Sequence, residues 1–501
     1  MRINKISLII ALIHWALTFF TDKLIFTVSP LEEPFNYIIC KILLGALLIA
    51  LWSFFLSIKN SPRLKRLIKL AIPYLIPIAA VLIFKLPQGF LSNDEKLIFE
   101  EAKKLASYKW FYYLTTYYYI ICMMLIPSFL GPILFKVGIQ VFTCAYSVLR
   151  MEELTKSKWS RLMYLPFLLP PVLAYTTSAH RIPVYFLLYL FMLYVLFIDK
   201  ISGKAPSTIK SAALILLSAI LTQWRTEGIY LSLLVPILLI IAYPFYRTRK
   251  YIFQIFVFSI LCQYLVSIPQ YGLIPNRMND QAENRMGPFY AYTITNMWRN
   301  GLDKEKNAED IEKVGRYLDL GVLDAINQDL KDINYEDVLI LYYPGYTGLK
   351  ENTEAEDYEA YTEGCRNIFL NNPDVFIRTR IGAFNYAALP YRIEWKEEGA
   401  KGFAYFLISI VKTISYNLYI PFTLLLVFLL FSIIKREYYT FFMCMGLCCH
   451  AFIVFILAPA SYFKYYFPIF MTVYFWTIMT LSFYLYSKKP LKLTITNDTT
   501  S

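Results

Sequence analysis

The stretch "LAIPYLIPIAAVLIF", from Leu70 to Phe84, contains no charged side chain. Such a run suits the hydrocarbon core of a bilayer, which an α-helix of about 20 apolar residues crosses. The 501-residue chain is 57% hydrophobic, more than a soluble protein of this size can cover with polar surface. We therefore predict an integral membrane protein.

Similar apolar blocks recur along the whole chain, about twelve in all. They centre on Ile9, Leu47, Ala79, Val141, Leu168, Leu190, Leu216, Leu234, Val257, Leu425, Phe452 and Phe475. The first block follows basic residues as in a signal peptide, but no small-residue cleavage site follows it, so we expect an uncleaved anchor. The predicted fold class is an all-α polytopic membrane protein with about twelve transmembrane helices.

Short basic loops between the blocks predict the orientation of the chain. Short loops rich in Lys and Arg stay in the cytoplasm, and with the amino terminus inside every one of these loops falls on that side. The loops are 59–69, 150–161, 200–204, 246–250, 435–437 and 488–492. Both termini are thus predicted to be cytoplasmic, in a cell membrane. These basic loops supply most of the excess positive charge, a net +13, and they would face anionic membrane lipids. No nucleic-acid partner is therefore needed to explain the net charge.

One long polar segment, about 270–400, should lie on the outer side of the membrane. It carries about 23 acidic and about 14 basic residues, and its helical stretches look amphipathic. We expect one mainly helical extracytoplasmic domain here. The predicted division is an N-terminal bundle (1–269), this domain (270–400), C-terminal helices (401–487) and a cytoplasmic tail (488–501). The outer segments contain no N-x-S/T acceptor, which favours a bacterial source.

Two adjacent carboxylates, Asp94 and Glu95, follow the apolar stretch in the first large outer loop, about 86–112. Ser92 and Glu95 match the S-x-x-E pattern of a capping box, so helix capping explains both acids. The helix that follows has an apolar face and is expected to lie along the membrane interface. The aromatic run 110–119 comes next, and we interpret it as a belt near lipid head groups.

The histidines and cysteines give little support for a metal centre. Three cysteines and a histidine lie close together in "CMGLCCH" (444–450), inside a predicted span, where sulfur packs well as a small apolar group. We interpret that motif as packing. The histidines His14, His180 and His450 are too scattered for a histidine-rich site.

The order of these features resembles the GT-C superfamily, polytopic glycosyltransferases that use sugars linked to polyprenyl phosphate. Protein O-mannosyltransferases and lipid A-modifying transferases are examples. An acidic pair after an apolar span, an interfacial helix and the span "PSFLGPILF" (127–135) resemble the start of that family. Three later stretches resemble its helix–turn–helix segments and its late outer loop: "LPPVLAYTTSAHRIPVYFLLYLFMLYV" (169–195), "LLSAILTQWRTEGIYLSLLVPILL" (216–239) and "APASYFKYYFPIFMTVYFWTI" (458–478).

The resemblance implies transfer of a sugar from a polyprenyl-phosphate donor to a cell-envelope glycan, lipid or protein, on the outer face of the membrane. A lipid phosphate leaves without being protonated, so one carboxylate is enough, and Asp94 is the implied general base. Glu95 then supports Asp94 or helps it hold a divalent ion such as Mg²⁺ or Mn²⁺. The implied activity is hexosyl or pentosyl transfer.

The donor phosphate requires cations, and the outer turns supply candidates for substrate binding. Arg225, Arg181 and Lys464 are the candidate phosphate ligands, since guanidinium matches phosphate oxygens and lysine acts as a point charge. His180 and Glu227 lie in the same turns. The structural alternative for each cation is an interfacial anchor, and Glu227 could simply neutralise Arg225. Lys464 stands where the family would have arginine.

Other classes of protein stay open at this point. A polymerase or ligase of lipid-linked glycans also has about a dozen spans, but it would rely on arginines in the large loop. A transporter or flippase of envelope polysaccharide would favour internal repeats, and the chain contains none that we detect. A membrane scaffold without enzymatic activity is the last alternative.

Overall fold

The computed structural model describes residues 5–30, 32–85, 93–106, 112–270, 286–328, 335, 348–350, 353–391 and 399–487. Every regular element in these ranges is a helix, and the β-contact found there is one isolated bridge, between Leu318 and Leu349. The prediction of an all-α protein is therefore confirmed for the described residues.

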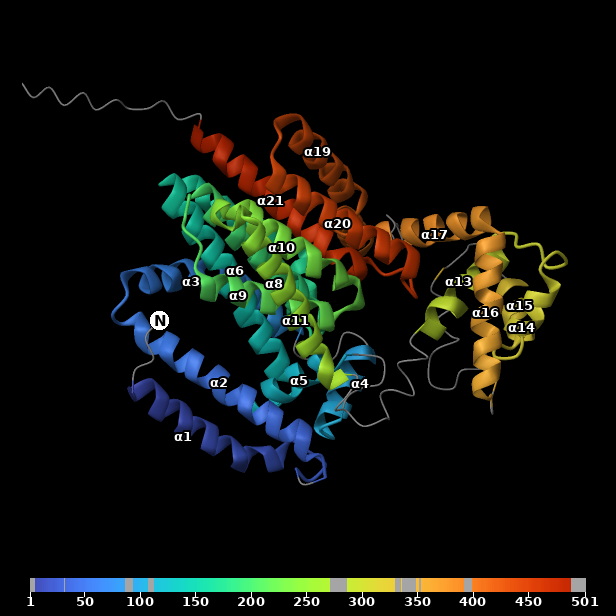
Figure 1. Cartoon of the computed structure of the whole chain (residues 1–501), viewed down its shortest axis with the longest axis horizontal. Helices are drawn as coiled ribbons and strands as arrows, with labels where there is room; N and C mark the ends of the chain where they lie inside the picture. The colour runs from blue at the N-terminus through green and yellow to red at the C-terminus, as the bar shows by residue number, and fades with distance from the viewer. Residues whose placement is uncertain are drawn as a thin grey trace, which may run out of the picture. The chain divides into compact units, whose positions relative to one another are not determined.

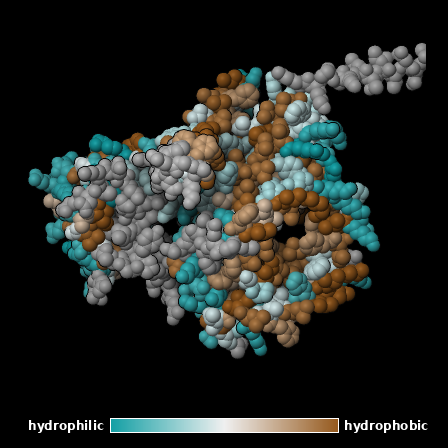
Figure 2. Space-filling model, turned by 180° about the vertical axis from the view of Figure 1, so that it is seen from behind, coloured by the Kyte–Doolittle hydropathy of each residue, from teal (hydrophilic) through white to brown (hydrophobic). Residues whose placement is uncertain are grey.

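Nine helical segments of the described chain are long and apolar enough to cross a bilayer. They are Lys5–Leu24, Pro34–Ile58, Pro62–Lys85, Leu130–Thr155, Ile182–Ile201, Arg249–Ile268, Gly402–Lys435, Tyr438–Leu457 and Phe463–Tyr486. Shorter apolar helices span Tyr113–Leu125, Thr208–Trp224 and Glu227–Ala242. Many of their large apolar side chains are exposed, as the brown areas of Figure 2 show, and such a surface suits lipid. The multi-pass helical character is confirmed, whereas the count of twelve spans stays a prediction.

Proline explains where the helices differ from the predicted blocks. The block centred on Leu168 forms a 3₁₀ helix, η3 (Lys158–Leu168), followed by the short helix α7 (Pro170–Thr176). Pro166 lies inside η3, and prolines stand at the start of α7. A proline ring removes a backbone donor and clashes with the preceding turn, so one continuous α-helix cannot form here.

The described chain divides into two compact units. Unit 1 contains residues 1–105, 117–205 and 471–501, and unit 2 contains 106–116 and 206–470. The helices of unit 1 are α1 (Lys5–Thr21), η1 (Asp22–Leu24), α2 (Pro34–Ile58), α3 (Pro62–Lys85), α4 (Asn93–Lys103), most of α5 (Tyr113–Leu125), α6 (Leu130–Thr155), η3, α7, α8 (Ile182–Ile201) and most of α21 (Phe467–Ser487). Figure 1 labels the longer ones.

Two antiparallel helices, α3 and α6, define the two ends of unit 1. The start of α3 meets the end of α6 through an ion pair between Arg63 and Glu153, and we name this the basic end. Lys85 closes α3 at the opposite end, where α6 begins, and we name this the carboxylate end because α4 lies next in the chain. At 24 residues, α3 is about 36 Å long, enough to separate the ends by a bilayer core.

The core of unit 1 is built around α8. Its long aromatic and aliphatic side chains are almost all buried, Tyr185 and Leu190 among them. The C-terminal helix α21 returns to this core, where the Phe475 ring meets the Tyr194 ring edge-on at 5.0 Å between centroids. Unit 1 therefore joins the first and last parts of the chain, a pairing that local hydropathy does not reveal.

Unit 2 contains the remaining apolar helices and the described part of the polar segment. Its elements are α9 (Thr208–Trp224), η4 (Thr226–Tyr230), α10 (Leu231–Ala242), η5 (Pro244–Arg247), α11 (Arg249–Ile268), α13 (Gly287–Arg299), α14 (Ala308–Val314), α15 (Leu320–Gln328), α16 (Ala355–Asn371), α17 (Pro373–Ala388), α18 (Gly399–Ser415), α19 (Tyr419–Lys435), α20 (Tyr438–Leu457) and η9 (Phe463–Tyr466). The predicted block around Leu425 coincides with α19, and α18 precedes it as a separate helix.

The polar segment has a hydrophobic core of its own. Buried side chains of α13, α14 and α16, including Ile294, Val314 and Tyr361, pack in one cluster. Arg380 of α17 connects it to α20: its Nε donates to the Phe455 carbonyl at 2.5 Å, and Nη2 donates to the Ala458 carbonyl. The predicted helical character is confirmed for the described residues. Its outer location and the predicted domain boundaries stay predictions, and labelling of a cysteine introduced at Lys306 from either side of the membrane would test the location.

Candidate functional site

Helix α4 holds the two carboxylates in its first turn, as predicted. Glu95 is only 1% exposed, whereas Asp94 keeps partial exposure. The face that carries Glu95 also carries the buried residues Ile98, Ala102 and Leu105. That face packs inside the protein, and the expected position of α4 along the membrane interface stays a prediction. Ser92, the predicted capping residue, lies outside the described residues.

Two lysines lie near enough to Glu95, at the carboxylate end of unit 1, for their charges to interact with it. The Glu95 charge interacts with Lys85, the last residue of α3, and with Lys136 of α6. Lys136 is 0% exposed, and a cation buried in an apolar helix requires a compensating charge or dipoles. Sequence reasoning missed both lysines. A signal existed for Lys136, since it is the one charged residue in the apolar run 130–149.

Helix α7 and the turn that follows it accept side-chain hydrogen bonds from three other helices. Lys136 donates to the carbonyls of Ser178 and His180, the latter at 2.7 Å. Tyr119 of α5 donates to the Ala179 carbonyl, and Lys85 donates to the Ala174 carbonyl at 2.7 Å. This turn carries His180 and Arg181, so Lys136, whose charge interacts with that of Glu95, also fixes the position of the predicted binding residues.

His180 and Arg181 lie in the same cluster as the carboxylates. His180 is buried, and its Nδ1 accepts from the Ile182 backbone N–H at 3.2 Å, which directs Nε2 to act as a donor. Arg181 immediately precedes α8 and is partly exposed. The charges of Asp94, Glu95 and Arg181 all act on the Tyr119 hydroxyl. Unit 1 therefore brings together acidic, basic and hydroxyl groups from five segments of the chain.

The tyrosine run was predicted to form a belt near lipid head groups, and that prediction is wrong for its described residues. Tyr117, Tyr118 and Tyr119 are buried in unit 1. Tyr117 donates to Asn36 Oδ1 at 2.8 Å and Tyr118 to the Pro132 carbonyl. A buried phenol needs a hydrogen-bond partner, and the run supplies such bonds to neighbouring helices instead of facing lipid. Trp110 lies outside the described residues.

A second charged cluster lies in unit 2 at the break between α9 and α10. Arg225 and Glu227 form a two-pronged ion pair, with Nε to Oε2 at 3.1 Å and Nη2 to Oε1, and their side chains are 5% and 16% exposed. The Arg225 guanidinium lies over the Tyr465 ring, 5.4 Å from its centroid. Neutralisation of Arg225 by Glu227, the structural alternative weighed above, is therefore present. Binding of phosphate by Arg225 stays a prediction.

Sequence reasoning missed His450 as a member of this second cluster. It is fully buried on α20, its Nε2 lies 2.9 Å from the Tyr465 carbonyl, and it interacts with the Glu227 charge. Lys464 of η9 lies next to Tyr465 in the chain, with its Nζ 4.4 Å from the centre of the Tyr462 ring.

No group of three or more His, Cys, Asp and Glu side chains suited to a metal ion occurs in the described ranges. Cys444 is buried and Cys449 exposed, so the "CMGLCCH" residues point in different directions on α20. A divalent ion at Asp94 and Glu95 therefore stays a prediction.

The predicted residues fall into two groups, one in each compact unit. Asp94, Glu95, His180 and Arg181 belong to unit 1, and Arg225, Glu227 and Lys464 belong to unit 2. Comparison of the chain with protein-family models, with curated proteins and with solved structures found no match. Function must therefore be inferred from the chemistry of these groups.

The ion pair of unit 2 leads to a prediction. Arg225→Gln should lower apparent stability in detergent by about 1.5–3 kcal/mol, because it leaves the Glu227 carboxylate largely buried without its cation. Arg225→Gln combined with Glu227→Gln should restore most of that loss. Midpoints of thermal unfolding at one fixed scan rate would measure both effects. A single variant as stable as the parent would mean that the pair has no structural role.

Proposed function

We propose that this protein is a membrane glycosyltransferase that moves a sugar from a polyprenyl-phosphate carrier to an acceptor of the cell envelope. The observation that supports the proposal is the cluster of unit 1, where Asp94 and Glu95 lie with Lys136, His180 and Arg181 at the carboxylate end. Buried ionisable groups at the end of membrane helices are costly, and function is the usual reason for keeping them.

Asp94 is the proposed general base, because it combines a carboxylate with partial exposure. The acceptor hydroxyl loses its proton to Asp94 while its oxygen attacks C1 of the sugar. The bond between C1 and the phosphate oxygen breaks, and its electron pair leaves with the phosphate. Arg181 lies in the same cluster and is the proposed partner of the growing phosphate charge, since guanidinium binds two phosphate oxygens at once.

Glu95 and Lys136 are proposed to position the reacting groups rather than to react. Both are buried, and their charges interact with each other. Lys136 also holds the turn of His180 and Arg181 through two carbonyls. This network would keep the cation and the base in a fixed geometry, which lowers the entropic cost of reaching the transition state.

Mass spectrometry of lipids that co-purify with the protein tests this proposal. A polyprenyl-phosphate hexose or pentose should be retained by the parent protein and lost in Arg181→Gln, which removes the proposed phosphate contact. A polyprenyl-diphosphate oligosaccharide would instead support a glycan polymerase or ligase. Retention of no glycolipid, together with uptake of envelope polysaccharide into vesicles, would support a transporter and contradict the proposal.

A further inference from the structure

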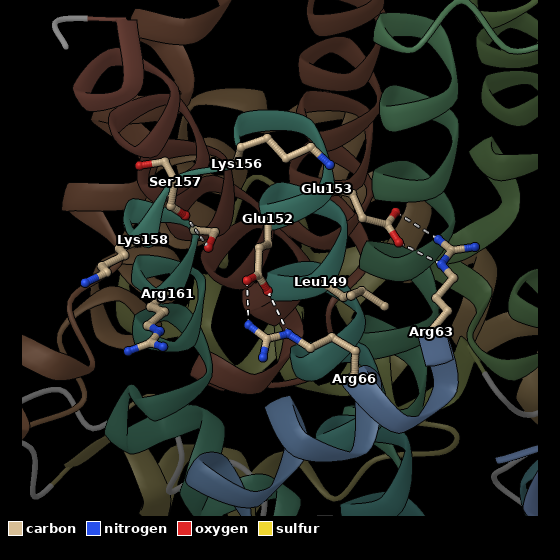
Figure 3. Close-up of a pocket in the computed structure, with 10 residues that line it drawn as sticks. Arg63, Arg66, Leu149, Glu152, Glu153, Lys156, Ser157, Lys158 and Arg161 are labelled. Carbon is tan, nitrogen blue, oxygen red and sulfur yellow. Dashed lines mark hydrogen bonds and ion pairs between the residues drawn. The ribbon is translucent and has the colours of Figure 1, made fainter. Parts of the chain in front are cut away.

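A cavity of about 540 Å³ lies at the basic end of unit 1, away from the cluster just described. The start of α3, the end of α6 and the start of η3 form its walls, as Figure 3 shows. Cationic side chains dominate the lining: Arg63, Arg66, Lys156, Lys158 and Arg161. The positive-inside pattern predicts that this end faces the cytoplasmic leaflet.

Ion pairs account for only part of this positive charge. Arg63 donates to both carboxylate oxygens of Glu153, at 2.7 and 3.0 Å, and Arg66 pairs in the same way with Glu152, at 3.3 and 2.5 Å (Figure 3). Five cations and two carboxylates line the cavity, so its lining carries a net charge of 5 − 2 = +3. Among the residues that the structure describes, no carboxylate pairs with Lys156, Lys158 or Arg161.

A fixed turn presents these three cations. Lys156 has a φ of +50° and ends α6, with its N–H donating to the Glu152 carbonyl at 2.8 Å. Ser157 then accepts from the Trp159 N–H, and the Ser160 hydroxyl donates to the Ser157 carbonyl at 2.8 Å. The backbone of the turn is thus held by its own hydrogen bonds, so the cations need little reorganisation to bind a ligand.

The surroundings of the cavity fit a lipid better than a solute. Trp159, beside the cationic turn, is 41% exposed, and Leu165 further along η3 is also exposed. Exposed tryptophan beside lysine and arginine is typical of the boundary between lipid tails and head groups. Two of its walls, α3 and α6, are among the helices long and apolar enough to span a bilayer.

We propose that this cavity binds the phosphate head group of an anionic phospholipid from the adjoining leaflet. Arg161 can engage two phosphate oxygens, and Lys156 and Lys158 add point charges. Arg63 and Arg66, held by their glutamates, form the rigid wall behind the head group. The proposal is independent of the sugar-transfer reaction, because it concerns the opposite end of unit 1.

Vesicle exchange followed by mass spectrometry of retained lipid tests the proposal. The purified full chain would be equilibrated with phosphatidylcholine vesicles containing phosphatidylglycerol, and the phosphatidylglycerol retained per protein would be measured. The triple variant Lys156→Gln, Lys158→Gln, Arg161→Gln should lower the apparent affinity about a hundredfold, at about fivefold for each charge. All three side chains are exposed, so the unfolding midpoint should not change.

A matched triple variant distinguishes a specific binding site from a general effect of positive surface charge. Arg247→Gln, Arg249→Gln, Lys250→Gln removes the same charge from exposed residues of another basic loop, none of which lines this cavity. We expect its loss of phosphatidylglycerol to be less than fivefold. Equal losses in both triple variants would overturn the proposal. So would displacement of the lipid by millimolar inorganic phosphate, which would identify a soluble phosphate as the ligand.

Discussion

Asp94→Asn is expected to leave the protein folded and to lower sugar transfer by about 10²- to 10⁴-fold. An amide does not take up a proton at neutral pH, so the acceptor hydroxyl loses its general base. Asparagine keeps the size of the side chain and still accepts hydrogen bonds near a helix start, so stability should fall by only about 0.3–1 kcal/mol. Transfer from a polyprenyl-phosphate sugar would be measured in membranes at matched protein level.

Glu100→Gln provides the matched control for this prediction. It makes a similar chemical change on the same helix, but the Glu100 side chain is 46% exposed and pairs with Lys103, one turn away at 3.0 Å. A surface pair of this kind contributes about 0–1 kcal/mol, so activity and stability should stay near those of the parent. Full activity of Asp94→Asn would mean that Asp94 only stabilises the start of the helix. The proposed general base would then lose its main support.

Glu95→Gln tests whether Glu95 positions the reacting groups, as proposed, or is itself the general base. Because Glu95 is buried against the charges of Lys85 and Lys136, its loss should lower both stability and transfer. Asp94→Asn should lower transfer alone. The reverse pattern, with a stable but inactive Glu95→Gln and an active Asp94→Asn, would assign the base to Glu95.

Lys41→Met is expected to destabilise the protein by about 3–5 kcal/mol, because it leaves a buried carboxylate without its cation. Lys41 of α2 and Asp22 of η1 are each 3% exposed at the side chain and lie 2.6 Å apart. Lys41 also donates to Thr18 at 2.7 Å, and Tyr37 donates to Asp22 at 2.6 Å. This network joins α1 to α2, which pack side by side (Figure 1).

The double variant Asp22→Asn, Lys41→Met tests whether the charge itself is required. It removes both charges and keeps similar volumes, so it should recover most of the stability that Lys41→Met loses. The midpoint of thermal unfolding in detergent, at a fixed scan rate, would compare parent, single and double variants. A double variant less stable than Lys41→Met would show that the side chains act through packing and not through the ion pair.

Much of the fold follows from local features of the sequence. Apolar runs predict the long helices because length and hydropathy alone decide whether a helix suits a bilayer. The helical nature of α14 and α15 follows from apolar residues at helical spacing, and the start of α4 follows from its acidic first turn. The split of the Leu168 block was also readable, since Pro166, Pro170 and Pro171 stand in the sequence.

The candidate site was only partly predictable. The sequence marked Asp94, Glu95, His180 and Arg181 as polar groups at the ends of apolar blocks, a local property. It did not show that the charge of Lys136 interacts with that of Glu95, or that His450 of α20 lies beside the Arg225–Glu227 pair. Such pairs join residues of different helices, and a single sequence carries no signal for which helices touch.

Hydropathy and charge are properties of single residues, so the sequence alone predicts a helical membrane protein with charged groups concentrated at the helix ends. The packing of the helices shows which carboxylate is buried, that the tyrosine run faces inward, and that α21 returns to the core around α8. The physical reason is that burial depends on neighbours: Glu95 and Asp94 are adjacent in sequence and chemically similar, yet α4 turns one toward the lysines and leaves the other partly exposed.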